Sequence, residues 1–213
     1  MSPFDKDVDH ARESNNPVDF ARCATIPLAV PLPFRIGLLR AINLAGHNKV
    51  GMADLCALAT KLGLKDAKTL LNSGNIVFRS DASPDDLERK LERAAAKDLG
   101  IETDFFVRTP AEWKAMIAAN PFPKEARADP SHLLAFVMRT EPSAKNVTAI
   151  QQANKGREIL RANGRCVYVY YPDGIGRSPL TNVMTEKTLG SRSTARNWNT
   201  VLKLAALSEA DGK

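Results

Sequence analysis

Short apolar segments alternate along the chain with stretches whose apolar residues recur at helical spacing. Residues 34–45 alternate well enough for a half-buried strand, and residues 52–62 then place apolar side chains on one face of a helix. Residues 68–71 and 75–78 predict two short strands, and the Asn-Ser-Gly-Asn sequence at 72–75 between them is typical of a hairpin turn. This part of the chain is therefore predicted to be strand, helix, strand, strand.

A second helix is predicted directly after this hairpin. Ser83 can cap unpaired amides, Pro84 suits the first helical position, and the two aspartates that follow complement the helix dipole. Residues 103–109 predict a fourth strand. The resulting order, βαββαβ, is the ferredoxin-like plan.

The same order begins again after a spacer, which is predicted as a helix over residues 110–119 and a proline-containing loop to residue 130. The later elements are predicted at residues 132–140 (strand), 143–154 (helix), 157–162 and 166–172 (a hairpin around Asn163 and Gly164) and about 194–208 (a last helix). The sequence thus predicts an α+β fold of two ferredoxin-like, βαββαβ-type subdomains that arose by structural duplication, with a C-terminal helix.

These elements divide the chain into four regions. Residues 1–33 are polar and of mixed charge and contain several prolines, so we expect a partly disordered N-terminal extension. The first subdomain is predicted at 34–109, the spacer helix and loop at 110–130, and the second subdomain with its C-terminal helix at 131–213.

The topology brings polar residues to one rim of the first sheet. A right-handed crossover makes the first two strands parallel, so the loop at residues 45–51 and the hairpin at 72–75 lie at the same end of the sheet. The polar residues predicted at this rim, with Arg40 reaching toward both loops, are Arg40, Asn43, Lys49, Ser73 and Asn75. Unpaired amides at the start of the following helix attract anions, and Arg40 and Lys49 would add positive charge.

The predicted last helix adds one further candidate. Trp198 is expected on the apolar face of this helix, in the protein core. Arg196 is expected in the first turn of the helix, where a positive charge opposes the helix dipole. Such an arginine requires a carboxylate, backbone carbonyls or a bound anion. We therefore include Arg196 as a helper of the anion site, with an internal partner as the alternative.

Composition narrows the classes of function. The net charge is +6, and the excess lies in residues 131–213, which carry twelve basic and six acidic side chains. A basic face formed by these residues would attract phosphate-bearing partners, or it would only aid solubility. Three separated cysteines and three separated histidines predict neither disulfides nor a metal site, and no cofactor is expected. No apolar run suits a membrane span, so we expect a cytoplasmic protein without a membrane partner.

Known catalytic motifs are absent from the sequence. Gly46 and Gly51 have the spacing of a P-loop, but Met52 replaces its lysine, and Ser178 does not lie in a nucleophile elbow. The first hypothesis is therefore a binding module for a phosphate-bearing ligand, a nucleotide or nucleic acid. The alternatives are an enzyme that acts on a small anionic metabolite at the same rim, or an interaction protein whose motifs are structural.

Four segments, at residues 38–52, 70–78, 171–182 and 193–207, together resemble the bacterial family called domain of unknown function 1697. The resemblance implies two joined ferredoxin-like subdomains and no established activity. The family's pattern has glycine where this chain has Ala41 and Ala45, and lysine where it has His47, which implies a weaker anion site at that loop. The motif positions that carry over are Arg40, Ile42, Asn43, Ser73, Gly74, Asn75, Arg196, Asn197, Trp198, Asn199 and Thr200.

Overall fold

The computed structural model describes residues 31–43, 49–180, 184 and 186–209, and within it Leu32–Lys213 form one compact unit. The first 30 residues of the predicted extension lie outside the described part, as do residues 44–48 of the loop that follows the first strand. Among the described residues, no helix is long and apolar enough to cross a membrane.

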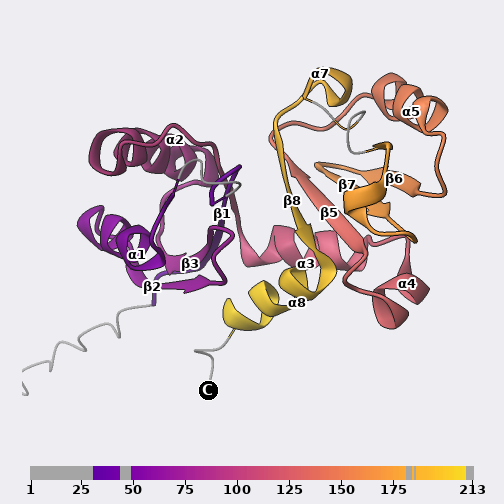
Figure 1. Ribbon diagram of the computed structural model, residues 1–213. Coiled ribbons are helices and arrows are strands. Elements are labelled where there is room, and N and C mark those ends of the chain that lie inside the picture. Colours follow the sequence, from indigo (N-terminus) through magenta and orange to yellow (C-terminus); the bar gives the residue numbers. More distant parts are fainter. Residues whose placement is uncertain (1–30, 44–48, 181–183, 185, 210–213) are drawn as a thin grey trace, which may run out of the picture. The chain divides into compact units, whose positions relative to one another are not determined.

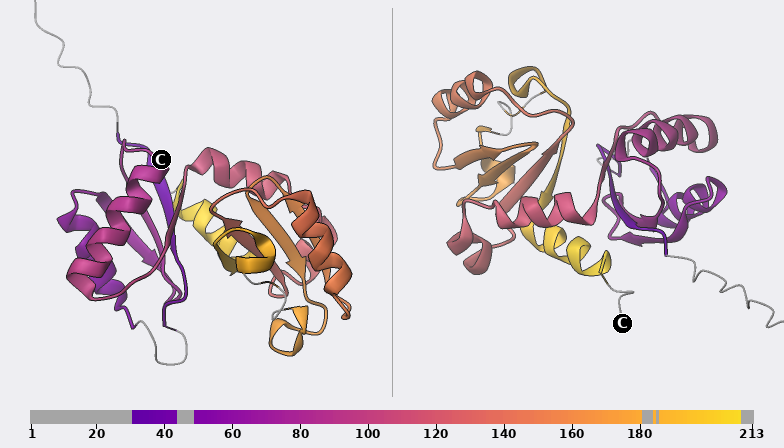
Figure 2. Two further views of the ribbon diagram at one scale, coloured as in Figure 1. Left: turned by 90° about the horizontal axis from the view of Figure 1, so that it is seen from above. Right: turned by 180° about the vertical axis from the view of Figure 1, so that it is seen from behind.

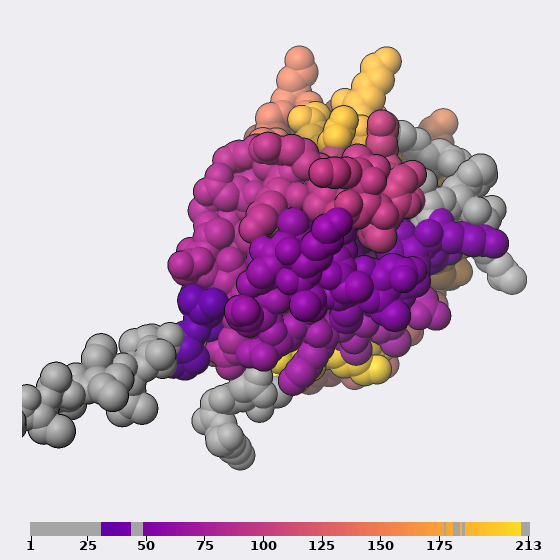
Figure 3. Space-filling view, turned by 90° about the vertical axis from the view of Figure 1, so that its left-hand side faces the viewer, coloured from indigo at the N-terminus to yellow at the C-terminus, as the bar shows by residue number. Residues whose placement is uncertain are grey.

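The N-terminal subdomain is a four-stranded antiparallel sheet with both of its helices on one face (Figure 1). Its strands follow the order β2-β3-β1-β4, which confirms the ferredoxin-like plan. Figure 3 views the molecule from the side of this subdomain, drawn in indigo to magenta. Its elements are β1 (Phe34–Leu39), α1 (Met52–Lys61), β2 (Lys65–Leu70), β3 (Asn75–Arg79), α2 (Pro84–Ala94), the π-helical turn η1 (Ala95–Leu99) and β4 (Phe105–Arg108).

Local sequence signals explain where several of these elements begin and end. The Ser83 hydroxyl accepts a hydrogen bond from the Asp86 amide at 3.2 Å, so α2 begins at the predicted cap. The first strand is shorter than the predicted 34–45 and ends at Leu39. Ala41 and Asn43 have φ angles of +50° and +55°, and this left-handed backbone cannot continue a strand.

The C-terminal subdomain repeats this topology. Its sheet has the order β6-β7-β5-β8, in which each strand occupies the place of its counterpart in the first sheet. In place of the second helix of the plan, the described residues between β7 and β8 include a 3₁₀ turn and the short helix α7. The elements are β5 (Leu133–Met138), α5 (Ala144–Ala153), β6 (Ile159–Asn163), β7 (Cys166–Tyr170), η2 (Ile175–Arg177), α7 (Glu186–Leu189), β8 (Ser193–Asn197) and α8 (Trp198–Leu207).

The predicted last helix over residues 194–208 was partly wrong, because its first turn is strand β8. This strand pairs with β5 along its whole length and completes the second sheet. The helix begins only at Trp198, where the Asn197 side chain accepts a hydrogen bond from the Thr200 amide. Pairing with a buried strand outweighs the helix propensity of Ala195 and Arg196.

Two helices connect the subdomains. As predicted for the spacer, α3 spans Pro110–Ala118, and a reciprocal capping box between Thr109 and Glu112 fixes its start. The loop after it, for which no helix was predicted, contains α4 (Pro123–Ala128). Trp113 on α3 donates its indole N–H to the Val201 carbonyl oxygen on α8 at 3.0 Å, which joins the spacer to the last helix.

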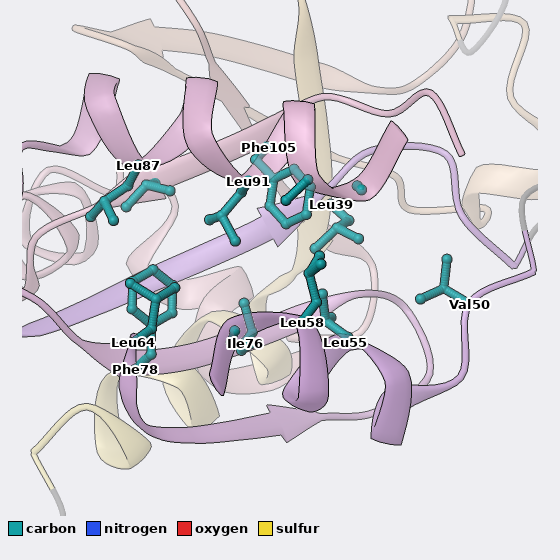
Figure 4. Close-up of a cluster of buried hydrophobic side chains, with 14 of the residues drawn as sticks. Leu39, Val50, Leu55, Leu58, Leu64, Ile76, Phe78, Leu87, Leu91 and Phe105 are labelled. Carbon is teal, nitrogen blue, oxygen red and sulfur yellow. The ribbon is translucent and has the colours of Figure 1, made fainter. Parts of the chain in front are cut away.

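The buried side chains form three clusters. One lies between the first sheet and helices α1 and α2, where Leu55 and Leu58 of α1 face Leu91 of α2 (Figure 4). A second lies between the C-terminal sheet and α5, on the face of that sheet against which α5 packs. The third contains side chains of both sheets together with Trp113 and Trp198 of α3 and α8, which lie side by side between the two sheets (Figure 2 shows the ribbons). The two subdomains therefore share one apolar core, and Trp198 is buried as expected.

Candidate functional site

Arg196 connects strand β8 to the other subdomain. It extends from β8 to the end of β1 and to the hairpin that joins β2 and β3, and it is 8% exposed. Three of the six predicted site residues meet here, since Arg196 contacts both Ser73 and Asn75. Its predicted place in the first turn of a helix was wrong, because it lies within a strand.

All five N–H groups of the Arg196 guanidinium have acceptors. Nε donates to Asn75 Oδ1 at 2.5 Å. Nη1 donates to Thr194 Oγ1 and to the carbonyl oxygen of Ala195, at 2.8 and 2.7 Å. Nη2 donates to the carbonyl oxygens of Leu39 and Ser73, at 2.8 and 2.9 Å. Since an arginine has five donors, none remains for a ligand in this arrangement. We call this set of contacts the arginine clasp.

The arginine clasp holds a buried cation with neutral acceptors only. Burial lowers the pKa of Arg196 to about 10, so the group remains charged at neutral pH. Gly74 lets the hairpin approach, because it has φ +71° and a Cβ there would come within 2.8 Å of Leu39 and 2.6 Å of Ile42. The hairpin sequence thus serves the clasp as well as the turn.

Asn43 fastens the loop after β1. Its side-chain oxygen accepts from the Val50 amide at 2.9 Å, and its side-chain nitrogen donates to the carbonyl oxygens of Val50 and Asn72, at 3.1 and 2.7 Å. The end of this loop and the hairpin are therefore neighbours, as the topology predicted for their described parts. Residues 44–48 of the loop lie outside the described residues.

Arg40 points away from the two loops that it was expected to reach. Its guanidinium lies 3.5 Å from Asp104 and 2.5 Å from Glu186, and its side chain is about one-third exposed. The expectation that Arg40 reaches both loops was wrong. Asp104 directly precedes β4, which pairs with β1, and its backbone carbonyl oxygen accepts from the Arg40 amide at 3.0 Å, so its carboxylate lies beside Arg40. The pair with Glu186 joins the two subdomains, whereas the pair with Asp104 lies within the N-terminal one.

Arg40 belongs to a larger group of charged residues. Arg139 and Arg192 of the C-terminal subdomain pair with carboxylates of the N-terminal one: Arg192 Nη1 lies 2.5 Å from Asp104 Oδ1, and Arg139 Nη2 lies 2.6 Å from Glu92 Oε1. Glu88 is buried and also pairs with Arg139, at 3.2 Å. We call this second set, in which every arginine has a carboxylate partner, the ion-pair network; its members are Arg40, Glu88, Glu92, Asp104, Arg108, Arg139, Glu186 and Arg192.

Lys49 lies apart from both sets. It is exposed, and it lines an open cavity of about 530 Å³ at the start of α1 together with Asn43, Gly51 and Asp54. Gly51 caps this helix without any side-chain hydrogen bond. The structure therefore divides the six predicted residues into three groups. Ser73, Asn75 and Arg196 meet in the clasp, Asn43 and Lys49 line the cavity, and Arg40 belongs to the ion-pair network.

The sequence did not identify the acidic partners of this region. Asp104 and Glu186 are far apart in the chain and carry no motif, so only the packing of the two subdomains brings both to Arg40. Burial raises the pKa of the Cys166 thiol to about 12, which makes this thiol unsuited to nucleophilic chemistry. In the part of the chain that the structure describes, no group of three or more His, Cys, Asp or Glu side chains is suited to a metal ion.

Comparison with known proteins gives a family and a fold. The family model described as "Protein of unknown function (DUF1697)" matches residues 34–168. The solved structure of a conserved bacterial protein from Streptococcus pneumoniae is similar, with a TM-score of 0.67, 22% identity, and coverage of 83% of this chain and 99% of that one. No curated protein sequence matched the chain. At this identity the similarity concerns the fold alone.

Proposed function

We propose that this chain, which belongs to the DUF1697 family of unknown function, is a binding module for a phosphate-bearing ligand that binds beside Lys49 at the start of α1. The observation that carries the proposal is the cavity there, which a lysine lines at an uncapped helix start. Nucleotides and nucleic acids both present the phosphate that such a site would bind.

The helix start supplies donors and the lysine supplies charge. The first amides of α1 have no acceptor within the helix and none from the Gly51 cap, so they are available to an anion. Lys49 has no ion pair among the described residues, so a phosphate would not have to displace a carboxylate from it. Both groups favour a bound anion.

Two neighbouring residues modify this site in opposite ways. Asn43 holds both backbone groups of Val50, which fixes the end of the loop and reduces the entropy lost on binding. Asp54 lines the same cavity and brings a negative charge, which opposes a bound anion. Arg40, Ser73, Asn75 and Arg196 take a supporting role in the proposal, because their side chains fix the frame on which this loop is built.

The experiment is a titration of the full chain with inorganic phosphate, a nucleoside triphosphate and a short single-stranded RNA, followed by thermal shift and calorimetry. We expect Lys49→Met to weaken binding at least about 10-fold, which is about 1.4 kcal/mol. Asp54→Asn should strengthen binding about two- to five-fold, because it removes a like charge from the helix start. Lys124→Met, which removes an exposed lysine elsewhere, is the matched control.

The pattern of the two variants decides the proposal. If both leave the affinity unchanged, the ligand does not bind at α1, and if no phosphate compound binds at all, the chain is better explained as an interaction protein. A steep loss of affinity with salt for RNA, but not for the nucleotide, would identify nucleic acid as the ligand.

A further inference from the structure

A second cavity lies between the spacer helix and the C-terminal sheet, among residues that the proposed phosphate site does not use. It has a volume of about 360 Å³ and is lined by α3, by β5 and by the hairpin that joins β6 to β7. Ligand pockets have volumes of about 300 to 1,000 Å³, so this cavity suits a small organic molecule.

The floor of this cavity is apolar. Trp113, Val137 and Tyr168 line it, and all three are fully buried. The polar atoms of the two aromatic rings are already paired, because the Trp113 indole N–H donates to Val201 and the Tyr168 hydroxyl donates to the carbonyl oxygen of Met116 at 2.6 Å. Because these side chains are fully buried, the accessible apolar surface of the cavity comes from Ala115, Met116 and Ala119 of α3, which also line it and are partly or fully exposed.

The rim of the cavity carries charged side chains of both signs. Among the described residues of this rim, one charged side chain has no partner of opposite charge. Arg165 pairs with Glu112 at 2.5 Å, and the buried Arg108 pairs with Glu88 at 3.3 Å. Glu141 is exposed and has neither an ion pair nor a side-chain hydrogen bond within the described ranges. Its carboxylate is thus free to bind a cation.

One further arginine lies near this carboxylate. Arg161 lines a neighbouring cavity that also includes Glu141, but its guanidinium donates to the carbonyl oxygen of Leu160 and forms no ion pair in the described structure. The charge of Glu141 is therefore not neutralised from that side either.

We propose that this cavity binds a small organic amine, whose apolar body lies on Ala115, Met116 and Ala119 and whose ammonium group pairs with Glu141. A carboxylate-bearing ligand would have to displace Glu112 from Arg165, whereas an amine displaces no protein group. Charge at the rim selects the class of ligand, and the apolar floor accepts its body.

Three probes with one apolar body and different charges test this site: 2-phenylethylamine, 3-phenylpropionate and the zwitterion phenylalanine. Calorimetry on the full chain should show that the amine binds with a Kd of about 1 mM or tighter and at least about 10-fold more tightly than the carboxylate. Glu141→Gln should weaken the amine at least about 10-fold without lowering the melting temperature, because its side chain is exposed and unpaired. Glu102→Gln, an exposed glutamate outside the cavity, is the matched control.

A second variant tests the floor independently of charge. Ala119 also lines the cavity, and Ala119→Leu should reduce binding of the amine by filling part of the volume. The proposal is overturned if the amine does not bind to the parent protein, if Glu141→Gln binds it equally well, or if the carboxylate binds as tightly as the amine. Binding of phenylalanine above that of the amine would also overturn it, since Arg165 would then be the selecting group.

Discussion

Two sets of arginine contacts join the subdomains, and they differ in what balances the positive charge. In the arginine clasp, one buried guanidinium donates only to neutral oxygens of β1, β8 and the hairpin. In the ion-pair network, Arg40, Arg139 and Arg192 face Glu88, Glu92, Asp104 and Glu186, and several of these side chains are partly exposed.

The two sheets are thus joined in two ways, by directional hydrogen bonds in the clasp and by electrostatic attraction in the network. Neutral oxygens bind a guanidinium through directional hydrogen bonds, so the clasp fixes the positions of the hairpin and β1 relative to β8. Dissolved salt should not weaken these hydrogen bonds. Exposed ion pairs act through charge, and dissolved salt screens them. The clasp should therefore contribute more to stability than the network, although it contains only one charged residue.

The largest expected effect comes from removing the clasp. Arg196→Met leaves the buried Asn75 Oδ1 without its donor and removes one donor from each of the carbonyl oxygens of Leu39 and Ser73, and should lower the free energy of unfolding by at least about 3 kcal/mol, measured by urea denaturation. Arg161→Met, at an exposed arginine on β6, is the control and should change stability by less than about 0.5 kcal/mol. A clasp variant as stable as this control would show that apolar packing alone joins the subdomains.

Glu88→Gln should give the next largest effect. Glu88 accepts from the Val107 amide at 2.8 Å and pairs with Arg108 and Arg139, so Glu88→Gln, which replaces one accepting oxygen by an N–H donor, should cost about 2 kcal/mol near pH 4.5 and less at neutral pH. Burial raises the pKa of Glu88 above its usual 4.5, despite the two arginines. The native state therefore binds the Glu88 proton more tightly than the unfolded state does. The stability that this proton contributes is fully present below pH 4.5 and is lost as the pH rises through the pKa of Glu88 in the native state.

The pH dependence is measured as the difference in unfolding free energy between the parent and Glu88→Gln. We expect this difference to decrease as the pH rises from 4.5. A difference that instead increases over this range would mean that the arginines, rather than burial, dominate the titration of Glu88.

Salt should distinguish the two sets of contacts with a smaller effect. Raising the ionic strength from about 0.05 M to about 1 M should lower the stability of the parent by up to about 1 kcal/mol, because it screens the partly exposed pairs of Arg192 and Arg40 with Asp104. Asp104→Asn should reduce this salt dependence, whereas Arg196→Met should retain it. Equal salt dependence in both variants would contradict the division between clasp and network.

The smallest effect concerns the residue between the two sets. Ala41 has a φ angle of +50° at a position where the family pattern has glycine. In the chain it follows Leu39, which belongs to the clasp, and Arg40, which belongs to the network, and it precedes Asn43. Ala41→Gly should stabilise the protein by up to about 1 kcal/mol by relieving this strain. Ala57→Gly, within the exposed face of α1, should destabilise by about as much. A loss of stability in Ala41→Gly would show that the alanine side chain compensates for its backbone.

The sequence by itself determined most of the elements and their order. Apolar periodicity located the strands and the longer helices, and short-range chemistry located turns and caps, such as Ser83 at α2 and the hairpin before Asn75. These features depend on residues close together in the chain, so a single sequence contains the information. The repeated strand order of the two sheets followed from the same reasoning.

The tertiary structure decided which polar residues meet. Residues 193–197 form a strand only because β5 offers a partner, and this pairing turns Arg196 from a presumed helix residue into the centre of the clasp. Arg40 pairs with Asp104, which precedes β4 in its own subdomain, and with Glu186, which the docking of the C-terminal subdomain brings to it. A long, charged side chain can reach several partners from one backbone position, so its partner depends on distant segments that local pattern does not encode.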